Sequence, residues 1–288
     1  MKKICVTGGN GFLGSQILLR LKLKKIPFLN IDIKKKNNLK LNFDTKVGDI
    51  NNVRFLNKSL RGVDTVIHLA AISDIEISKK NIKKTFDVNL NGLINLLEAC
   101  KVNKIKKIIF SSSIYVSGNK GGYYAISKLA CEKVIKEFCK KNKIKYVILR
   151  FGSLYGPGSD DNNGIHKILQ NALSKKKLIF SGSNLTEREY IYIKDAAEFT
   201  IKTLENKYDN KTLIVTGNQT YDSKKVIQLI SEILNLPQNI IFKKIKNTAH
   251  NEKTAYFYED EPIKVSQNFY TDLSQGIINT IKFIKNNK

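Results

Sequence analysis

A glycine-rich turn near the N-terminus most limits what this chain can fold into. It follows the apolar stretch Lys3–Thr7 and leads into a helical pattern at Gly11–Leu23. Glycine permits a tight turn and lets the backbone approach a pyrophosphate at the helix N-terminus, where the helix dipole favours anions. The spacing fits G-x-G-x-x-G at Gly9, Gly11 and Gly14, and also G-x-x-G-x-x-G at Gly8, Gly11 and Gly14. The alternative is a purely structural strand–helix turn, but both spacings predict a Rossmann-type dinucleotide site.

Apolar strands alternate with helical patterns through the first 150 residues. Strands are expected at Pro27–Ile31, Thr65–Leu69, Lys107–Phe110 and Tyr146–Leu149, and long helices at Thr85–Cys100 and Tyr124–Lys141. Continuous apolar strands between helices indicate a parallel sheet covered on both faces. We therefore expect an α/β fold with a doubly wound parallel sheet, in which residues 1–150 form an NAD-binding Rossmann domain, extended by parts of 185–220.

The pattern loosens after residue 150, where turn residues cluster at 155–164. Helices are expected at Ile165–Ser174, Lys194–Leu204, Ser223–Leu234 and Asp272–Ile284, and short strands at Leu178–Phe180, Leu213–Val215 and Ile240–Phe242. We expect residues 151–288 to form mostly a smaller substrate-binding lobe, interleaved with the first domain.

The charge of the chain comes from lysine, with 45 lysines, five arginines and a formal net charge of +25. The lysines are scattered along the whole chain, so no nucleic-acid partner is expected, although the charge would attract a diphosphate substrate. No run of 18 apolar residues occurs, which predicts no membrane insertion. The cysteines lack metal-ligand spacing and are expected to be reduced, buried thiols of a cytoplasmic protein without a metal. They are Cys5, Cys100, Cys131 and Cys139.

An aspartate closes the second strand. Asp32 follows Gly14 by 18 residues. A carboxylate there accepts a hydrogen bond from the ribose 2′-hydroxyl and repels a 2′-phosphate, so the cofactor is expected to be NAD. Lys34, Lys35 and Lys36 follow at once and could hold a 2′-phosphate, which leaves NADP as the alternative.

A serine, a tyrosine and a lysine point to proton-transfer chemistry. The strand Lys107–Phe110 leads into Ser111-Ser112-Ser113, at the sheet edge where open α/β sheets bind ligands. Tyr124 and Lys128 are four residues apart and share one helical face. A free tyrosine, with a pKa of about 10, is a poor base at neutral pH, but a nearby ammonium would stabilise its phenolate. These residues follow the glycine turn and Asp32 in order along the chain, which makes a chance occurrence of the Tyr124–Lys128 spacing less plausible.

The chain resembles the extended short-chain dehydrogenases/reductases of the NAD-dependent epimerase/dehydratase (nucleotide-sugar epimerase) family. The resemblance runs from residue 7 to about residue 198. The matching segments are TGGNGFLG (Thr7–Gly14), GDI (Gly48–Ile50), HLAA (His68–Ala71), DVNLNG (Asp87–Gly92), FSSSIYVSG (Phe110–Gly118), YAISKLACE (Tyr124–Glu132), LRFGSLYGPG (Leu149–Gly158) and REYIYIKDAAE (Arg188–Glu198).

The resemblance implies a role for each matching residue. Tyr124 would be the base, Ser113 would bind the substrate oxygen, and Lys128 would bind the nicotinamide ribose and lower the tyrosine pKa. Cofactor contacts are expected at Gly8, Gly11, Phe12, Leu13, Gly14, Asp32, Asp49, Ile50, Leu69, Ala70, Ala71, Asn89, Tyr124 and Lys128. Substrate contacts are expected at Ser113, Tyr124, Ser153 and Arg188, the last with the diphosphate.

Some of these positions have a structural alternative. Asn89 could bond only the backbone, and Arg188 could form a surface ion pair with Glu187 or Glu189. His68 is expected to be a core or turn residue rather than an acid.

The sequence also departs from the family pattern. Ser113 and Tyr124 are only 11 residues apart, where relatives often have a longer loop, and Ser153 stands where many sugar enzymes carry asparagine. No arginine follows Arg188, so a lysine such as Lys243 or Lys244 would have to replace a second phosphate-binding arginine. The segment His250–Phe257 could shape the sugar pocket or only pack against the lobe.

The reaction expected from this resemblance is C4 epimerisation of a nucleotide-diphosphate sugar through a transient 4-keto intermediate. Sugar dehydratases carry an Asp-Glu pair just after the catalytic hydroxyl, where this chain has Ile114 and Tyr115, so dehydration is not expected. Two alternatives remain: an NAD(P)-dependent sugar dehydrogenase or reductase with net redox change, and a non-catalytic Rossmann-fold binding protein that uses its basic surface. The resemblance also implies a homodimer, paired through the helices at 85–101 and 124–141. It further implies a role in polysaccharide synthesis.

Overall fold

The computed structural model describes residues 3–118, 120–181, 186–237, 240–243, 262–265 and 270–287. Its main element in these ranges is an eight-stranded sheet with the order β13-β10-β6-β5-β4-β1-β2-β3, in which every neighbouring pair is parallel. The strands are β1 (Ile4–Thr7), β2 (Phe28–Asp32), β3 (Thr45–Val47), β4 (Thr65–His68), β5 (Lys107–Ser113), β6 (Lys145–Phe151), β10 (Lys211–Val215) and β13 (Ile263–Lys264). This arrangement confirms the expected α/β fold with a parallel Rossmann-type sheet.

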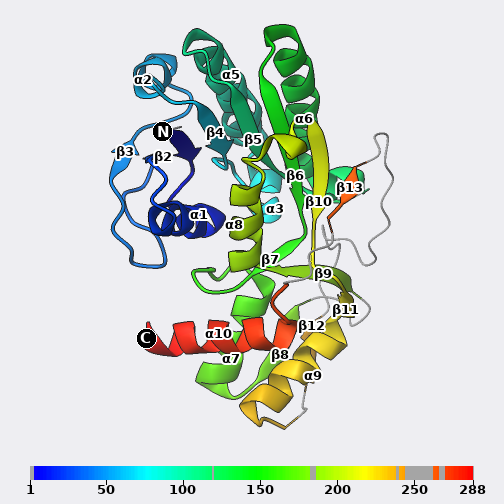
Figure 1. Ribbon diagram of the computed structural model, residues 1–288. Helices are drawn as coiled ribbons and strands as arrows, with labels where there is room; N and C mark the ends of the chain where they lie inside the picture. The colour runs from blue at the N-terminus through cyan, green and yellow to red at the C-terminus, as the bar shows by residue number, and fades with distance from the viewer. Residues whose placement is uncertain are drawn as a thin grey trace.

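Helices cover both faces of the sheet (Figure 1). On one face, α1 (Phe12–Leu23) packs beside α8 (Ile193–Lys202), and both contribute to a buried apolar layer. The other face carries α2 (Val53–Ser59), α5 (Gly92–Val102) and α6 (Gly122–Asn142) over a second apolar layer. The shorter α3 (Ile75–Lys80) and α4 (Ile82–Phe86) lie against α6. Burial on both faces explains why the strands read as continuous apolar runs.

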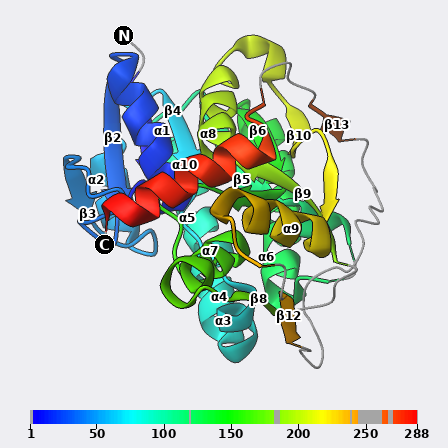
Figure 2. The ribbon, with the colours of Figure 1, turned by 90° about the horizontal axis from the view of Figure 1, so that it is seen from below.

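A third apolar cluster lies below the main sheet in Figure 1, at α7 (Gly164–Lys175), α9 (Ser223–Leu234) and α10 (Leu273–Asn286). Two small sheets accompany it: β11-β9-β7 and β12-β8. Their strands are β7 (Ser153–Tyr155), β8 (Leu178–Ser181), β9 (Glu187–Tyr192), β11 (Thr220–Asp222) and β12 (Ile240–Lys243). Seen from below, α9 and α10 lie side by side across the molecule (Figure 2). The chain enters this part after β6 and returns to the main sheet at β10 and β13.

Two elements differ from their expected form. The helix predicted at Thr85–Cys100 is divided into α4, a π-helical turn at Asp87–Asn91 and α5. The wider turn carries Asn89, whose side chain reaches Ile72 and Ser127. Strand β5 continues past Phe110 to Ser113, because its serines pair with the end of β6.

The four cysteines are free and buried, as expected. Among the described residues, the helices are too short or too polar to cross a bilayer. Lys244 and the segment His250–Phe257 lie outside the described residues, as does the side chain of Lys243.

Candidate functional site

The glycine turn joins β1 to α1 and lies against the end of β4. Gly8 has φ +73°, and a Cβ on it would come within 2.7 Å of the Ala70 nitrogen. A Cβ on Gly14 would lie 2.3 Å from the Gly8 carbonyl oxygen. Gly11 is the exposed N-cap of α1 and offers no side chain to the first helical N–H groups. A glycine turn with an open helix N-terminus fits a pyrophosphate.

Asp32 is fixed between the glycine turn and the loop after β2. Its Oδ2 accepts from the Asn10 N–H at 2.9 Å, and its Oδ1 accepts from the Lys34 N–H at 2.9 Å. Each carboxylate oxygen has a further lone pair. The side chain is therefore held at the end of β2, where it can still accept from a ribose hydroxyl.

The other expected cofactor residues surround this turn at the carboxyl ends of the strands. Leu69, Ala70 and Ala71 are half-buried after β4, and Leu69 N–H bonds to the Thr7 carbonyl at 3.0 Å. Asp49 is exposed and accepts from Asn51 N–H, whereas Ile50 is buried against α5. In α1, Phe12 is half-buried and Leu13 belongs to the core.

Asn89 is buried and has protein partners on both sides. Its Oδ1 accepts from Ile72 N–H at 2.7 Å, and its Nδ2 donates to the Ile72 carbonyl and to Ser127 Oγ. The amide therefore ties the loop after β4 to helix α6. Asn89 therefore bonds a side chain as well as backbone, and the alternative that it bonds only backbone is wrong.

Ser113, Tyr124 and Lys128 come together where β5 ends and α6 begins. Ser113 lies beside the Tyr124 phenol and lowers its pKa against the larger effect of burial, and Ser113 Oγ accepts from Tyr115 N–H at 3.3 Å. Gly121 and Gly122, with φ +98° and +52°, begin α6 after the short connection. Both Ser113 and Tyr124 are buried. The structure thus assembles the predicted set despite its close spacing in sequence.

Lys128 has two contacts of its own in the structure. Its Nζ donates to the Ser111 carbonyl at 2.8 Å and lies 4.7 Å from the centre of the Phe110 ring. Burial raises the pKa of Tyr124 to about 12, and Ser113 opposes this rise. Burial also lowers the pKa of Lys128 to about 8. Burial therefore keeps the phenol protonated at neutral pH in the protein alone.

His68 is a core residue, as expected. It is buried at the end of β4, bonds through Nδ1 to Thr7 Oγ1 at 2.7 Å, and stacks on Phe110. Burial, with a smaller contribution from the charge of Lys128, lowers the pKa of His68 to about 3. The ring therefore stays neutral at physiological pH and serves as packing.

Arg188 reaches the same region from β9. Its Nη1 donates to Tyr115 Oη at 3.0 Å, while Glu189 pairs with Lys264 at 2.6 Å. Tyr115 raises the pKa of both Tyr124 and Tyr190, although burial is the main cause in each case. The phenols and the guanidinium therefore form one polar cluster.

Tyr115 and Tyr190 were not expected in this cluster. Tyr190 could have been inferred from strand alternation, because it lies two residues after Arg188. Tyr115 could not, since its contact with Arg188 joins residues 73 positions apart. The expected substrate residue Ser153 lies on β7, opposite Tyr190 in the strand register.

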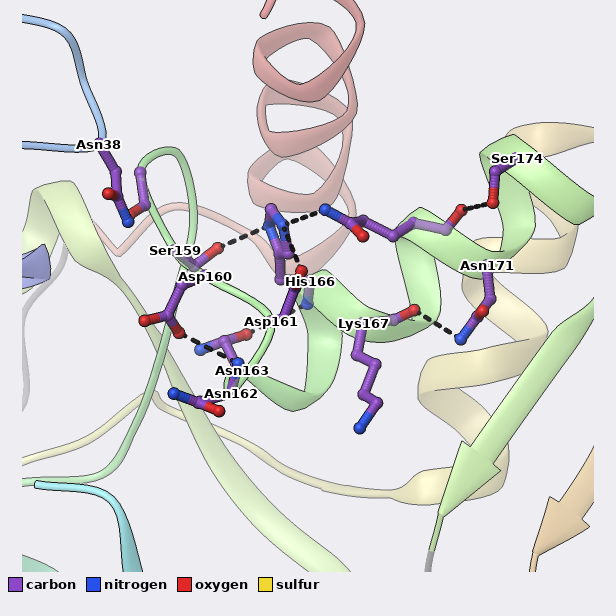
Figure 3. A network of polar contacts seen from close by, with 12 residues as sticks. Asn38, Ser159, Asp160, Asp161, Asn162, Asn163, His166, Lys167, Asn171 and Ser174 are labelled. Carbon is purple, nitrogen blue, oxygen red and sulfur yellow. Dashed lines mark hydrogen bonds and ion pairs between the residues drawn. The ribbon is translucent and has the colours of Figure 1, made fainter. Parts of the chain in front are cut away.

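A polar loop, residues 156–163, connects β7 to α7 (Figure 3). His166 lies between Ser159 Oγ, 3.1 Å from Nδ1, and the Gln170 amide, 2.9 Å from Nε2. Asn38 donates to the Gly158 carbonyl, so the loop also contacts the segment after β2. The Ser159 hydroxyl donates to the Gly156 carbonyl and is buried. This serine–histidine contact therefore stabilises the turn rather than presenting a nucleophile.

The chain is similar to known proteins over most of its length. A sequence model of the NAD dependent epimerase/dehydratase family matches residues 4–217. The chain is 30% identical over 258 residues to the uncharacterized UDP-glucose epimerase YtcB of Bacillus subtilis (strain 168), covering 80% of this chain and 82% of that one. It is 25% identical to the UDP-N-acetyl-alpha-D-glucosaminuronate decarboxylase of Bacillus cytotoxicus, covering 99% of this chain and 98% of the relative. A structure of Bacillus cereus UDP-glucuronic acid 4-epimerase with UDP-glucuronic acid and NAD aligns with a TM-score of 0.83 at 26% identity, over 99% of this chain and 100% of the other.

Proposed function

This chain belongs to the NAD-dependent epimerase/dehydratase family, and we propose that it inverts C4 of a nucleotide-diphosphate sugar through a transient 4-keto intermediate. The observation that carries the proposal is the buried position of Ser113 beside Tyr124, with Lys128 one helical turn away. This arrangement places a proton acceptor beside a hydroxyl donor at the ligand-binding edge of the sheet.

The cofactor fits the residues that are present. Gly11 leaves the N-terminus of α1 open, and Asp32 can accept a hydrogen bond from a ribose hydroxyl. The pyrophosphate would lie on Gly8, Gly11 and Gly14, the adenine near Asp49 and Ile50, and the nicotinamide ribose near Tyr124 and Lys128. Bound NAD+ would accept a hydride from the sugar carbon and return it, and its positive ring would lower the pKa of Tyr124.

Tyr124 takes the proton from the sugar 4-hydroxyl in this mechanism. Ser113 donates a hydrogen bond to the sugar oxygen as it becomes a carbonyl, and this bond stabilises the negative charge that develops on the oxygen in the buried site. Lys128, held by the Ser111 carbonyl, supplies a fixed positive charge beside the pair. After the sugar turns over, Tyr124 returns the proton to the opposite epimer.

The substrate class follows from Arg188 and from the relatives. A guanidinium suits the diphosphate of a nucleotide sugar, and the named relatives act on UDP-sugars. Ile114 is buried and Tyr115 contacts Arg188, so neither supplies the acid and base that water elimination needs. A sugar dehydrogenase or reductase with net redox change is the second candidate, because its first half-reaction uses the same residues.

An NMR assay of the purified protein tests the proposal with UDP-, GDP- and dTDP-hexoses and substoichiometric NAD+. We expect one sugar to yield its 4-epimer in amounts that exceed the cofactor supplied. Oxidised product that stops at one equivalent per NAD+ would establish a dehydrogenase instead. No reaction with any sugar would contradict both enzyme readings and favour a binding protein.

Replacing Asp32 with alanine should weaken the preference for NAD+. The substitution removes an acceptor of a charge-assisted hydrogen bond, so NAD+ affinity should fall about 10-fold, while NADP+ affinity should rise beside Lys34. Isothermal titration with both dinucleotides measures the ratio. Asp44→Ala is the matched control, an exposed carboxylate 12 residues further on. An unchanged NAD+/NADP+ ratio in Asp32→Ala would contradict the assignment.

Replacing Arg188 with methionine should raise the KM for the nucleotide sugar by about 10- to 100-fold, because a charged hydrogen bond to phosphate is lost. NAD+ affinity should not change. Steady-state kinetics with the sugar found by NMR provide the measurement, and Arg54→Met, which changes an exposed residue of α2, is the control. If KM is unchanged and only stability falls, Arg188 serves to hold Tyr115.

A homodimer through α5 and α6 is proposed from apolar side chains exposed on both helices. Ile94 is 40% and Ile126 is 55% exposed. Such residues favour a two-fold interface. Ile126→Glu should give monomers in sedimentation velocity at concentrations where the wild-type protein sediments as a dimer. Leu23→Glu, which changes an exposed leucine on α1, should not alter the mass. A monomeric wild-type protein would contradict the proposal.

A further inference from the structure

A buried ion pair lies behind the catalytic set. Glu132 on α6 and Arg150 on β6 are 1% and 4% exposed. The contact is bidentate: Arg150 Nη2 donates to Glu132 Oε2 at 2.6 Å, and Arg150 Nε donates to Oε1 at 3.0 Å. The pair therefore fixes the distance between the helix that carries Tyr124 and Lys128 and the strand next to β5.

Each member of the pair also holds a serine near Ser113. Ser112 Oγ donates to Glu132 Oε1 at 2.5 Å, and Arg150 Nη1 donates to Ser117 Oγ at 3.2 Å. Ser112 immediately precedes Ser113 and is the register partner of Arg150. Ser117 ends the short 3-10 helix that follows Ser113. The segment that carries Ser113 is thus held at both ends by one ion pair.

The net stability of the fold does not explain why an ion pair occupies this buried position. Desolvation offsets much of the attraction between two buried charges, so a buried ion pair contributes little net stability compared with apolar residues of the same size. Its directed hydrogen bonds, however, fix three elements in one geometry. Glu132 is also four residues after Lys128 on the same helical face, and its charge raises the pKa of Lys128 against the larger effect of burial.

We propose that Glu132 and Arg150 are positioning residues, which hold Ser113 against Tyr124. Their opposite charges also cancel, so that the buried region next to Lys128 carries no net charge from the pair. The proposal rests on the proposed role of Tyr124 as the base. Arg150 balances the charge of Glu132, so removing either partner leaves one net charge in a buried region, where its effect on neighbouring groups is large. Among the described residues, Cys131 on α6 also affects the pKa of Lys128, and Lys128 affects that of His68 on β4. The titratable groups that affect the pKa of Tyr124 are Tyr115 after β5 and Cys131.

The test is a pH titration of Tyr124 in three variants: Glu132→Gln, Arg150→Gln and the double variant. Phenolate absorbance is recorded with saturating NAD+, and the spectrum of the same variant carrying Tyr124→Phe is subtracted. Loss of the negative charge should lower the apparent pKa of Tyr124, and loss of the positive charge should raise it, each by about 0.5–1 unit. The double variant should return close to the wild-type value. A purely structural pair would lower the melting temperature of both single variants and leave all three titrations equal, which would overturn the proposal.

Two milder variants keep the test decisive if a single charge change prevents folding. Ser112→Ala and Ser117→Ala leave the ion pair intact but release one end of the Ser113 segment. Because Ser113 opposes the rise in the pKa of Tyr124, both variants should raise that pKa, and kcat should fall with KM unchanged. Ser231→Ala, which removes another buried serine bond in α9, is the control. Titrations that match this control would overturn the proposal. The titration needs no sugar, so its result stays separate from the outcome of the epimerase assay.

Discussion

Tyr124→Phe should abolish most of the activity while leaving the fold and the cofactor site intact. The phenol is buried beside Ser113, so the substitution removes the proposed proton acceptor and little packing. General acid–base catalysis contributes about 10²–10⁴-fold, and kcat should fall by that factor. The NMR epimerase assay measures kcat, and NAD+ titration should give an unchanged affinity within about twofold.

The neighbouring tyrosine provides a matched control for this variant. Tyr123 is 38% exposed and precedes Tyr124 in the same helix, so Tyr123→Phe removes an equivalent hydroxyl on a different face. Its kcat should equal that of the wild-type protein. Full activity in Tyr124→Phe would contradict the proposed mechanism. A non-catalytic binding protein would bind its ligands equally well with tyrosine or phenylalanine at this position.

The fold could be predicted from sequence because its signals are local. The glycine turn, the apolar strands and the helical spacings each lie within a short stretch, and they fixed the parallel sheet and most of its helices. Strand β13 could not be found in this way, since it consists of two exposed residues whose pairing with β10 depends on the rest of the sheet. The π-helical turn at Asn89 was missed for a similar reason, because it depends on contacts with Ile72 and Ser127.

The candidate site was predicted where one motif carries each residue, as for Ser113, Tyr124 and Lys128. Orientation was harder to predict. The spacing of Tyr124 and Lys128 places both on one helical face, but it does not predict the bond from the ammonium to the Ser111 carbonyl. The contact between Arg188 and Tyr115, and that between Glu132 and Arg150, join distant segments. No spacing rule within one element reports such contacts.

Gly14→Ala provides the second large expected effect, because two physical terms predict opposite signs. Alanine in place of glycine within a helix ordinarily stabilises by about 1 kcal/mol. Here the new Cβ would lie 2.3 Å from the Gly8 carbonyl oxygen and 2.6 Å from Gly9 Cα. These are backbone atoms, which cannot rotate away as a side chain can. We therefore expect a net loss of about 1–3 kcal/mol in the free energy of unfolding.

The same clash should also weaken NAD+ binding, by at least about 10-fold, since the turn that moves is the one proposed to hold the pyrophosphate. Denaturant unfolding and NAD+ titration measure the two effects. Gly164→Ala is the control, because Gly164 begins α7 and a Cβ there meets no atom within 4 Å. That variant should keep wild-type stability and NAD+ affinity. If Gly14→Ala instead stabilises the protein and binds NAD+ normally, α1 can shift away from the glycine turn. The close packing of α1 against the turn would then not be required for NAD+ binding.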